Sequence, residues 1–481
     1  MIKYNFIRAR LFRKVIKLSM VMTLLFICQY VYANIRLPEV LSSNMVLQQK
    51  SGVNIWGWAD PGEKVLITTS WDGKKDSVVT DGNGKWKIIV QTPGAGGPYS
   101  VSLKGNNQIN LENVMIGEVW VCSGQSNMEM NFYWGLPQMN EDFEDANNSN
   151  IRFFHIPKST ALLPQERSEG RWEVSDSNNV KSFSAVAWYF GKRLQKELGV
   201  PIGLIHASWG GTPAEAWTPA HVIESVQDLK DAAKRLGSSN HWPVQPGLAY
   251  NSMIAPLTSF VIGGAIWYQG ESNTGTASTY HQLFSNMILG WRAQWKKDFP
   301  FLYVQLAPYS YGRRNEGALL REAQEKTLSV PKTGMVVTTD IGGDTTDIHP
   351  RNKRDVGYRL AGIALSDVYG KALDSKSIRF HEMKISGQKI ILKFTPGQQP
   401  VQKGRSVLGF QVAGKDQVFL EAIAQVVGNE IHVWHDLVTE PVAVRYAFSN
   451  TALGNIAGKN GLPLAPFRTD NWKVDTSPVK K

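Results

Sequence analysis

At 481 residues the chain is too long for one hydrophobic core, so we expect two or three domains. Hydrophobic residues make up 42% of the chain and charged residues 19%, which excludes a disordered protein. The formal net charge is +11, but no basic run follows the first residues, so we expect no binding to nucleic acid. No Cys or His cluster has metal-ligand spacing, and we expect no bound metal.

Residues 1–33 are expected to be a signal peptide rather than part of the fold. A segment with six Lys or Arg precedes the mostly apolar stretch Leu18–Tyr32, which is short for a transmembrane helix. Val31-Tyr32-Ala33 fits a cleavage site, which favours cleavage over an uncleaved anchor. Removal of the six basic residues lowers the net charge from +11 to +5. We therefore expect a secreted protein, periplasmic or extracellular, with no stable membrane insertion after cleavage.

Residues 34–113 are expected to form an N-terminal β-sandwich. Short segments rich in β-branched and aromatic residues, such as Val53–Trp58 and Lys64–Thr69, alternate with turn sequences such as Asp60-Pro61-Gly62. Strands this short and this regularly separated are typical of a sandwich. Residues 372–481 show a similar pattern, which predicts a C-terminal β-rich domain or extension.

Residues 114–371 are expected to form an α/β domain with a parallel sheet. Short apolar runs, such as Val119–Cys122 and Ile202–Ala207, alternate with segments of helical periodicity, such as Ala185–Leu198. In such sheets ligands bind beyond the carboxyl ends of the strands. The loops that follow the apolar runs are therefore where a functional site is expected.

The loop after Val119–Cys122 has a serine where a nucleophile could lie. It reads Ser123-Gly124-Gln125-Ser126-Asn127-Met128, so Ser126 is expected between a strand end and a helix start. Its own N–H would then lie at a helix N-terminus, where partial positive charge stabilises an oxyanion. Ser126 and Glu129 also have capping-box spacing, which predicts a capping role. The two interpretations are compatible, because a nucleophile can also cap a helix.

The second loop offers backbone donors. Thr212 and Glu215 have a second capping-box spacing, which predicts a helix start at this point. Gly210 and Gly211 come immediately before it, where their N–H groups are free to bind an anion. Glycine is needed where the backbone must approach a substrate closely, although glycines before a capped helix are often only a turn.

The third and fourth loops supply polar side chains. The third reads Gln269-Gly270-Glu271-Ser272-Asn273, with amides and a carboxylate at a strand end. The fourth contains Asp347 and His349, just before a helix expected from Lys353. Histidine is the usual base for a serine nucleophile, and a carboxylate fixes its tautomer. A structural role for His349 within its loop is the alternative.

In this order, the four motifs resemble the sialate O-acetylesterase branch of the SGNH hydrolases. The motifs are Gly-Gln-Ser-Asn-Met, Gly-Gly-Thr-x-x-Glu-Ala-Trp, Trp-x-Gln-Gly-Glu-Ser and Asp-x-His-Pro-x-x-Lys. The likeness runs over nearly all of the chain after the signal peptide. It implies a flavodoxin-like, three-layer α/β/α catalytic domain between two β-rich regions. It also implies a carbohydrate O-acetylesterase that needs no cofactor.

The resemblance also implies roles for individual residues. Ser126 would attack the acetyl carbonyl, while His349 would take its proton and later activate water. The N–H groups of Ser126 and of Gly210 or Gly211 would stabilise the oxyanion. Each such donor is typically worth about 3–4 kcal/mol of the barrier.

The sequence departs from the wider superfamily at two points. Thr346 stands where the superfamily has the aspartate of its last motif, so the carboxylate partner of the histidine is open: Asp347 is the first choice and Glu271 the second, with a Ser-His dyad as a third arrangement. The superfamily's third motif supplies an Asn, whereas Gln269 matches this branch. We therefore assign the side-chain oxyanion donor to Gln269 over Asn273.

Sialic acid with a 9-O-acetyl group is the substrate that the resemblance favours, and acetylated xylan of plant cell walls is the alternative. A sialic-acid carboxylate would suit a nearby arginine; Arg321 is the candidate, and a surface charge on its helix is an equally good explanation. A non-catalytic glycan-binding protein is a further hypothesis, which the presence of Ser126 and His349 disfavours. A peptidase or lipase is disfavoured because Ser126 lacks the Gly-x-Ser-x-Gly motif.

Overall fold

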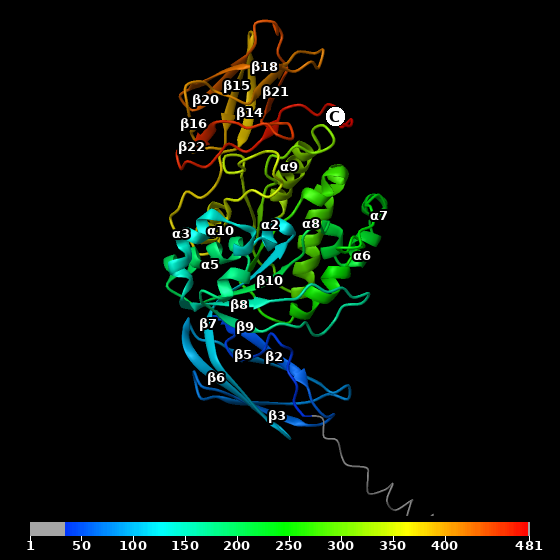
Figure 1. Cartoon of the computed structure of the whole chain (residues 1–481), viewed down its shortest axis with the longest axis vertical. Coiled ribbons are helices and arrows are strands. Elements are labelled where there is room, and N and C mark those ends of the chain that lie inside the picture. Colours follow the sequence, from blue (N-terminus) through cyan, green and yellow to red (C-terminus); the bar gives the residue numbers. More distant parts are fainter. Residues whose placement is uncertain (1–33, 480–481) are drawn as a thin grey trace, which may run out of the picture.

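The computed structural model describes residues 34–479, so the expected signal peptide lies outside the described residues. Figure 1 shows three parts along the long axis of the molecule: a β region at the N-terminal end, a helix-covered sheet in the middle, and a second β region at the other end. Within residues 34–479, no helix is long and apolar enough to cross a membrane.

The N-terminal β region contains two facing groups of strands. Its strands are β1 (Val46–Gln48), β2 (Gly52–Trp58), β3 (Lys64–Thr69), β4 (Lys75–Val79), β5 (Lys85–Gln91) and β6 (Gly96–Lys104). Antiparallel pairing gives the order β4-β3-β6-β7, while β2 and β5 form a separate two-stranded sheet. Alternate residues such as Val53 and Ile55 on β2, and Val65 and Ile67 on β3, are buried, as expected where one face of each sheet packs on the other.

The long strand β7 (Gln108–Gly124) belongs to both the N-terminal and the central regions. Its first part pairs with β6 in antiparallel fashion, and its last part pairs with β10 and β11 in parallel. The predicted domain boundary at 113/114 therefore falls inside a strand. The backbone turns there, because Asn113 has φ 56° and the register with β6 shifts nearby.

The central sheet follows the order β13-β12-β11-β7-β10-β8-β9. Its other strands are β8 (Asn148–His155), β9 (Trp172–Ser175), β10 (Ile202–Ser208), β11 (Gly264–Tyr268), β12 (Phe301–Val304) and β13 (Thr333–Val336). Neighbouring strands are parallel, except that β9 is antiparallel to β8. Taken alone, β7, β10, β11, β12 and β13 have the flavodoxin-like order 2-1-3-4-5. The loop after β7 lies where this order reverses, which is where doubly wound sheets bind ligands.

Helices cover both faces of the central sheet. The long ones are α5 (Ala185–Leu198), α8 (Ala277–Trp295), α9 (Glu316–Lys326) and α10 (Lys353–Asp367); the short ones are α2 (Ser126–Glu129), α3 (Pro137–Asp142), α4 (Asn179–Ser182), α6 (Ala220–Glu224) and α7 (Gln227–Lys234). The buried residues of α5 and α10 share one core and those of α8 and α9 another, so the sheet lies between two helical layers. The sequence sets the ends of α5: Ser184 caps its start by accepting the N–H of Ala187, and Gly199 ends it with φ 67°.

The C-terminal region has its own apolar core between two four-stranded antiparallel sheets. One sheet contains β14 (Phe380–Ser386), β15 (Lys389–Phe394), β19 (Ile423–Val427) and β20 (Glu430–Trp434), and the other contains β17 (Phe410–Ala413), β18 (Leu420–Glu421), β21 (Ala443–Tyr446) and β23 (Phe467–Arg468). A third pair is formed by β16 (Pro400–Gln402) and β22 (Ile456–Gly458). The predicted fold class, a three-layer α/β/α domain with β-rich flanks, is confirmed.

Candidate active site

Ser126 is the first residue of α2, directly after the carboxyl end of β7. Gly124 makes the turn with φ 142°, and a Cβ there would lie 2.2 Å from the carbonyl oxygen of Tyr268, so only glycine fits. The first N–H groups of a helix have no acceptor within the helix, which leaves the N–H of Ser126 directed outward. The serine hydroxyl and a backbone donor thus come from one residue.

The capping-box prediction for α2 is wrong. Gln125 is the N-cap residue and its side chain makes no capping bond. Glu129, which would have completed the box, instead accepts the backbone N–H of Gly210 at 2.6 Å and the ammonium of Lys158 at 2.6 Å. A charge-assisted bond to another loop competes successfully with a local cap.

The structure joins Ser126 to His349. Nε2 of His349 lies 2.9 Å from Oγ of Ser126, although the two residues are 223 positions apart. His349 comes from the loop between β13 and α10, at the same edge of the sheet as α2. The Trp134 ring and the imidazole pack in a T-shaped arrangement with centroids 5.3 Å apart. This is the hydrogen bond that a serine nucleophile and its general base require.

Asp347, the first choice as carboxylate partner, lies beside His349. Its Oδ1 is 4.0 Å from Nδ1 of the imidazole and accepts the backbone N–H of His349 at 2.9 Å. Nε of Arg351 lies 3.9 Å from the other carboxylate oxygen. At 4.0 Å the two side chains interact by charge rather than through a direct hydrogen bond.

Glu271, the second choice, lies in a different, buried group. Its carboxylate forms a short hydrogen bond with Nδ2 of Asn127, the residue after the serine. Nδ2 of Asn127 also donates to the carbonyl of Ile348 at 3.1 Å, and its Oδ1 accepts from the ammonium of Lys353 at 2.7 Å. Lys353 also donates to the carbonyl of Pro350. This group fastens the start of α2 to the loop that carries the histidine.

Burial governs the charges of these groups. Burial lowers the pKa of His349, the charge of Lys353 lowers it further, and the carboxylates of Asp347 and Glu129 act in the opposite direction. Burial also lowers the pKa of Lys353 to about 7. It raises the pKa of Glu271, against the bond from Asn127 and the charge of Lys353. The imidazole therefore holds its neutral, proton-accepting form to lower pH than an exposed histidine does.

The glycines of the second loop lie next to the serine. A Cβ on Gly210 would be 3.2 Å from Cβ of Ser126, so this backbone passes next to the serine side chain. The N–H of Gly210 is occupied by Glu129. Gly211 has φ 81°, and the ring of Trp242 fills the space where its Cβ would be.

The second capping-box prediction is also wrong. The segment after the glycines is the short 3-10 helix η3 (Ala214–Trp217), and no side chain caps it. The hydroxyl of Thr212 donates to the carbonyl of Trp209 and accepts from Nε1 of Trp217. Glu215 is buried and accepts from Nδ2 of Asn273 at 2.8 Å. Neither residue of the expected box therefore caps the helix.

The amides of the third loop are fully buried and engaged with protein. Nε2 of Gln269 donates to Oδ1 of Asn273 at 2.8 Å and to the carbonyl of Thr212 at 3.3 Å, and its Oε1 accepts from Tyr280 at 2.8 Å. Asn273 also accepts the N–H of Ala214 at 2.9 Å. In this arrangement both amides hold the second and third loops together, and both protons of the Gln269 amide are already used.

Comparison with known proteins places this geometry in a family. The family described as carbohydrate esterase, sialic acid-specific acetylesterase, matches residues 116–366. The sialate O-acetylesterase of Homo sapiens is 30% identical over 411 residues, which cover 76% of this chain and 78% of the human protein. The chain belongs to the sialic acid-specific acetylesterase family.

Other relatives of this acetylesterase agree. The sialate O-acetylesterase of Mus musculus is 28% identical over 402 residues, which cover 70% of this chain and 74% of the mouse protein. The crystal structure of a carbohydrate acetylesterase from Xanthomonas citri matches with a TM-score of 0.84 and 38% identity, over 91% of this chain and all of that one. Membership makes the chain a carbohydrate esterase, which is a hydrolase of carboxylic esters.

Arg321 lies on α9 of this acetylesterase. Its side chain is fully buried at 0% exposure on α9, and its guanidinium donates to the carbonyl of Ser449 in the C-terminal region. Burial lowers its pKa to about 10. The full burial of its side chain contradicts the surface-charge explanation, whereas the expected contact with a substrate carboxylate stays a prediction.

Four residues were not predicted from the sequence to belong to the site. Asn127 and Lys353 stand within the first and fourth motifs, where their polar side chains were the available signal. Glu129 was assigned to a cap instead. Trp134 lies in the 3-10 helix η1 (Phe132–Trp134) and is 40% exposed. Its ring packs on the His349 imidazole and adds an exposed apolar surface next to the Ser126–His349 pair.

Proposed function

We propose that this acetylesterase removes acetyl groups from sugars by a serine mechanism. The observation that carries the proposal is the 2.9 Å hydrogen bond between Oγ of Ser126 and Nε2 of His349. Oγ attacks the acetyl carbonyl carbon as Nε2 takes its proton. The C–O bond to the sugar then breaks, and the sugar oxygen leaves with that proton. The acetyl group stays on Ser126 as an ester.

Water completes the cycle. Nε2 of His349 takes a proton from water as the water oxygen attacks the acetyl ester, and acetate leaves as Oγ of Ser126 regains a proton. Asp347 stabilises the imidazolium in both half-reactions, because its charge favours the protonated ring at 4.0 Å. No cofactor enters either step.

The oxyanion needs donors near Ser126. The N–H of Ser126 supplies one, at the start of α2. Gly210 supplies a second once Glu129 releases its N–H, since its backbone passes next to the serine. The amides of Gln269 and Asn273 act indirectly by fixing the second loop.

For the sugar, we propose a 9-O-acetylated sialic acid first, because the curated relatives carry the name sialate O-acetylesterase. Acetylated xylan is the second candidate, favoured by the burial of Arg321, the predicted carboxylate-binding residue. Release of acetate from 9-O-acetylated sialoglycans and from acetylated xylan, measured side by side, separates the two. We also propose export through residues 1–33, which N-terminal sequencing of the mature protein tests.

Hydrolysis of p-nitrophenyl acetate tests the mechanism. Ser126→Ala and His349→Ala should each lower kcat at least about 10³-fold, because the two residues act as one unit. Ser123→Ala is the matched control: it removes a hydroxyl three residues earlier that is buried and has no hydrogen-bond partner among the described residues. A wild-type kcat in Ser126→Ala would contradict the proposed mechanism.

A further inference from the structure

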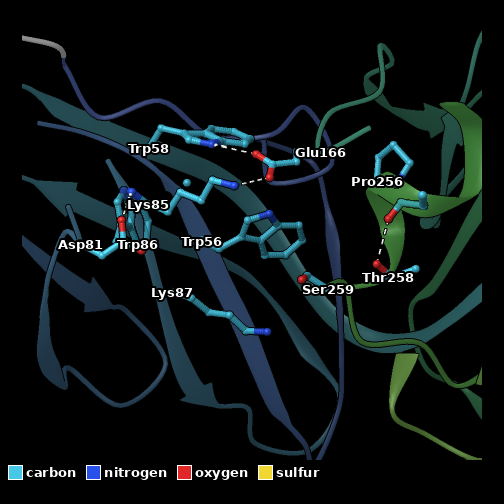
Figure 2. A pocket seen from close by; sticks show the side chains of 12 residues that line it. Trp56, Trp58, Asp81, Lys85, Trp86, Lys87, Glu166, Pro256, Thr258 and Ser259 are labelled. Carbon is cyan, nitrogen blue, oxygen red and sulfur yellow. Dashed lines mark hydrogen bonds and ion pairs between the residues drawn. The ribbon is translucent and has the colours of Figure 1, made fainter. Parts of the chain in front are cut away.

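A cavity of about 310 Å³ lies at the joint between the N-terminal β region and the central domain. None of the residues that line it belongs to the candidate active site. Figure 2 shows the rings of Trp56 and Trp58 on one side, with Pro256, Thr258 and Ser259 facing them. The tryptophans lie on β2, and the facing residues lie at and just after the 3-10 helix η5 (Ala255–Leu257). Its volume is at the lower end of pockets that hold small ligands, roughly 300–1,000 Å³.

The aromatic wall is built by the outward face of the β2–β5 sheet. Trp58 lies opposite Lys85 and Trp56 opposite Lys87, so the four side chains project from one face. Both tryptophans are half-buried, while the intervening Gly57 is buried. Trp56 packs partly on Phe260, with ring centroids 6.5 Å apart, and both tryptophans also line the cavity.

Glu166 holds this wall in place. Its carboxylate accepts from Nε1 of Trp58 at 3.4 Å and pairs with the ammonium of Lys85, as the dashed lines in Figure 2 show. One anchored indole ring and several hydroxyl, carboxylate and ammonium groups thus surround the same space. Flat apolar rings that pack on the C–H face of a sugar, with polar groups in reach of its hydroxyls, are what saccharide recognition needs.

The charges around the cavity balance. Among the lining residues, Asp81 and Glu166 contribute two negative charges, and Lys85 and Lys87 contribute two positive ones. The guanidinium of Arg167 also lies over the Trp58 ring, 5.9 Å from its centroid, but it is paired with the carboxylate of Glu39 and adds no net charge. An acidic sugar would need a net positive site, whereas this wall offers none. The balance therefore favours a neutral saccharide.

One loop connects this cavity to the neighbourhood of the catalytic serine. The loop between β8 and β9 carries Lys158, which pairs with Glu129 beside Gly210, and eight residues later Glu166. Eight residues span at most about 29 Å. A polysaccharide chain can reach over that distance, whereas a single sugar cannot.

We propose that the cavity is an accessory binding site for a neutral oligosaccharide chain. Binding there raises the local concentration of acetylated sugars near Ser126 without contributing to the chemistry. Hydrolysis of small esters should not depend on this cavity, because they carry no oligosaccharide chain to bind there. The proposal goes beyond the esterase activity and stands even if the nucleophile is assigned wrongly, because its test measures binding.

The test is isothermal titration calorimetry with xylohexaose, cellohexaose and mannohexaose as neutral probes and 3′-sialyllactose as the acidic one. We expect the wild type to bind at least one neutral hexaose, and Trp58→Ala and Trp56→Ala to weaken that binding at least tenfold. Glu166→Gln, an exposed side chain outside the core, should weaken it less but measurably. All variants should keep wild-type hydrolysis of p-nitrophenyl acetate.

Ile89→Ala is the matched control, because Ile89 is 59% exposed on β5 and does not line the cavity. It should bind like the wild type. No binding of any neutral hexaose by the wild type at millimolar concentration overturns the proposal. Equal affinities for wild type, Trp58→Ala and Glu166→Gln, or preferential binding of 3′-sialyllactose, overturn it too. If a Trp variant loses p-nitrophenyl acetate hydrolysis, its fold is disturbed, and the affinity of Glu166→Gln for the hexaose then tests the proposal.

Discussion

The carboxylate of Glu129 accepts the backbone N–H of Gly210 at 2.6 Å, directly beside Ser126. The second carboxylate oxygen is paired with Lys158. A negative charge therefore occupies the donor best placed, after the N–H of Ser126, to stabilise an oxyanion. In the proposed mechanism the carboxylate of Glu129 and the oxyanion are both negatively charged. The carboxylate must therefore release the N–H of Gly210 before that N–H can bind the oxyanion.

Glu129→Gln should therefore raise kcat/KM for p-nitrophenyl acetate. The amide keeps the length of the side chain but removes the charge and weakens the bond to Gly210, because hydrogen bonds to charged groups are worth about 1.5–3 kcal/mol against roughly 0.5–1.5 for neutral ones. We expect an increase of up to about tenfold. Steady-state kinetics on the purified variant measures it.

Lys158→Met is the matched comparison for Glu129→Gln. It removes the partner of Glu129 without touching Gly210 and should change kcat/KM less. Because Glu129 also raises the pKa of His349, the acid limb of the pH profile should move to lower pH in Glu129→Gln. A fall in kcat/KM with an unchanged profile contradicts the proposed competition and makes Glu129 a residue that holds the second loop.

Asp347→Asn should shift the acid limb of kcat/KM to lower pH and lower the plateau. The limb reports the pKa of the base in the free enzyme, and the neutral imidazole of His349 is the active form. Asp347 raises the pKa of His349, so its loss lowers it. Its loss also removes the charge that stabilises the imidazolium, which lowers kcat. An unshifted limb would mean that Asp347 has no electrostatic contact with the base.

Lys353→Met should move the same limb in the opposite direction. The pKa of Lys353 is lowered to about 7, so it is charged in the acidic range where the limb lies, and its charge lowers the pKa of His349. Methionine fills a similar volume without the charge, so the acid limb of the pH profile should move to higher pH. Shifts of the same sign in both variants contradict the assignment; circular dichroism checks that the buried site still folds.

The convergence of the four loops was predictable because parallel strands present their carboxyl ends at one edge. That rule placed Ser126 and His349 together from positions 223 residues apart. It does not say where a long side chain goes. Glu129 and Glu215 have capping-box spacing, yet each binds another loop, because local spacing carries no information on partners brought near by the fold.

The burial of Arg321 on α9 could not be predicted from the sequence either. The sequence allowed Arg321 to be a surface charge on its helix, but its side chain is fully buried and the carbonyl of Ser449, in the C-terminal region, accepts from its guanidinium. The continuity of the chain across residue 113 was hidden for a related reason. The composition of β7 suggests two segments, and only pairing with both β6 and β10 shows it to be one strand.

Gly124→Ala should destabilise the protein and misplace the nucleophile together. Gly124 has φ 142°, a region nearly restricted to glycine, and a Cβ there would lie 2.2 Å from the carbonyl oxygen of Tyr268. Backbone strain alone costs on the order of 1–3 kcal/mol. The contact is with backbone on β11, so it cannot be relieved by rotating a side chain, and Ser126 two residues later must shift.

The midpoint of thermal unfolding and kcat on p-nitrophenyl acetate should therefore both fall. Gly275→Ala is the control, since a Cβ at Gly275, in the loop of Glu271, has no neighbour within 4 Å. It should leave both quantities unchanged. A stable Gly124→Ala with full activity would show that β7 and β11 can separate at their carboxyl ends. The turn before Ser126 would then not require glycine.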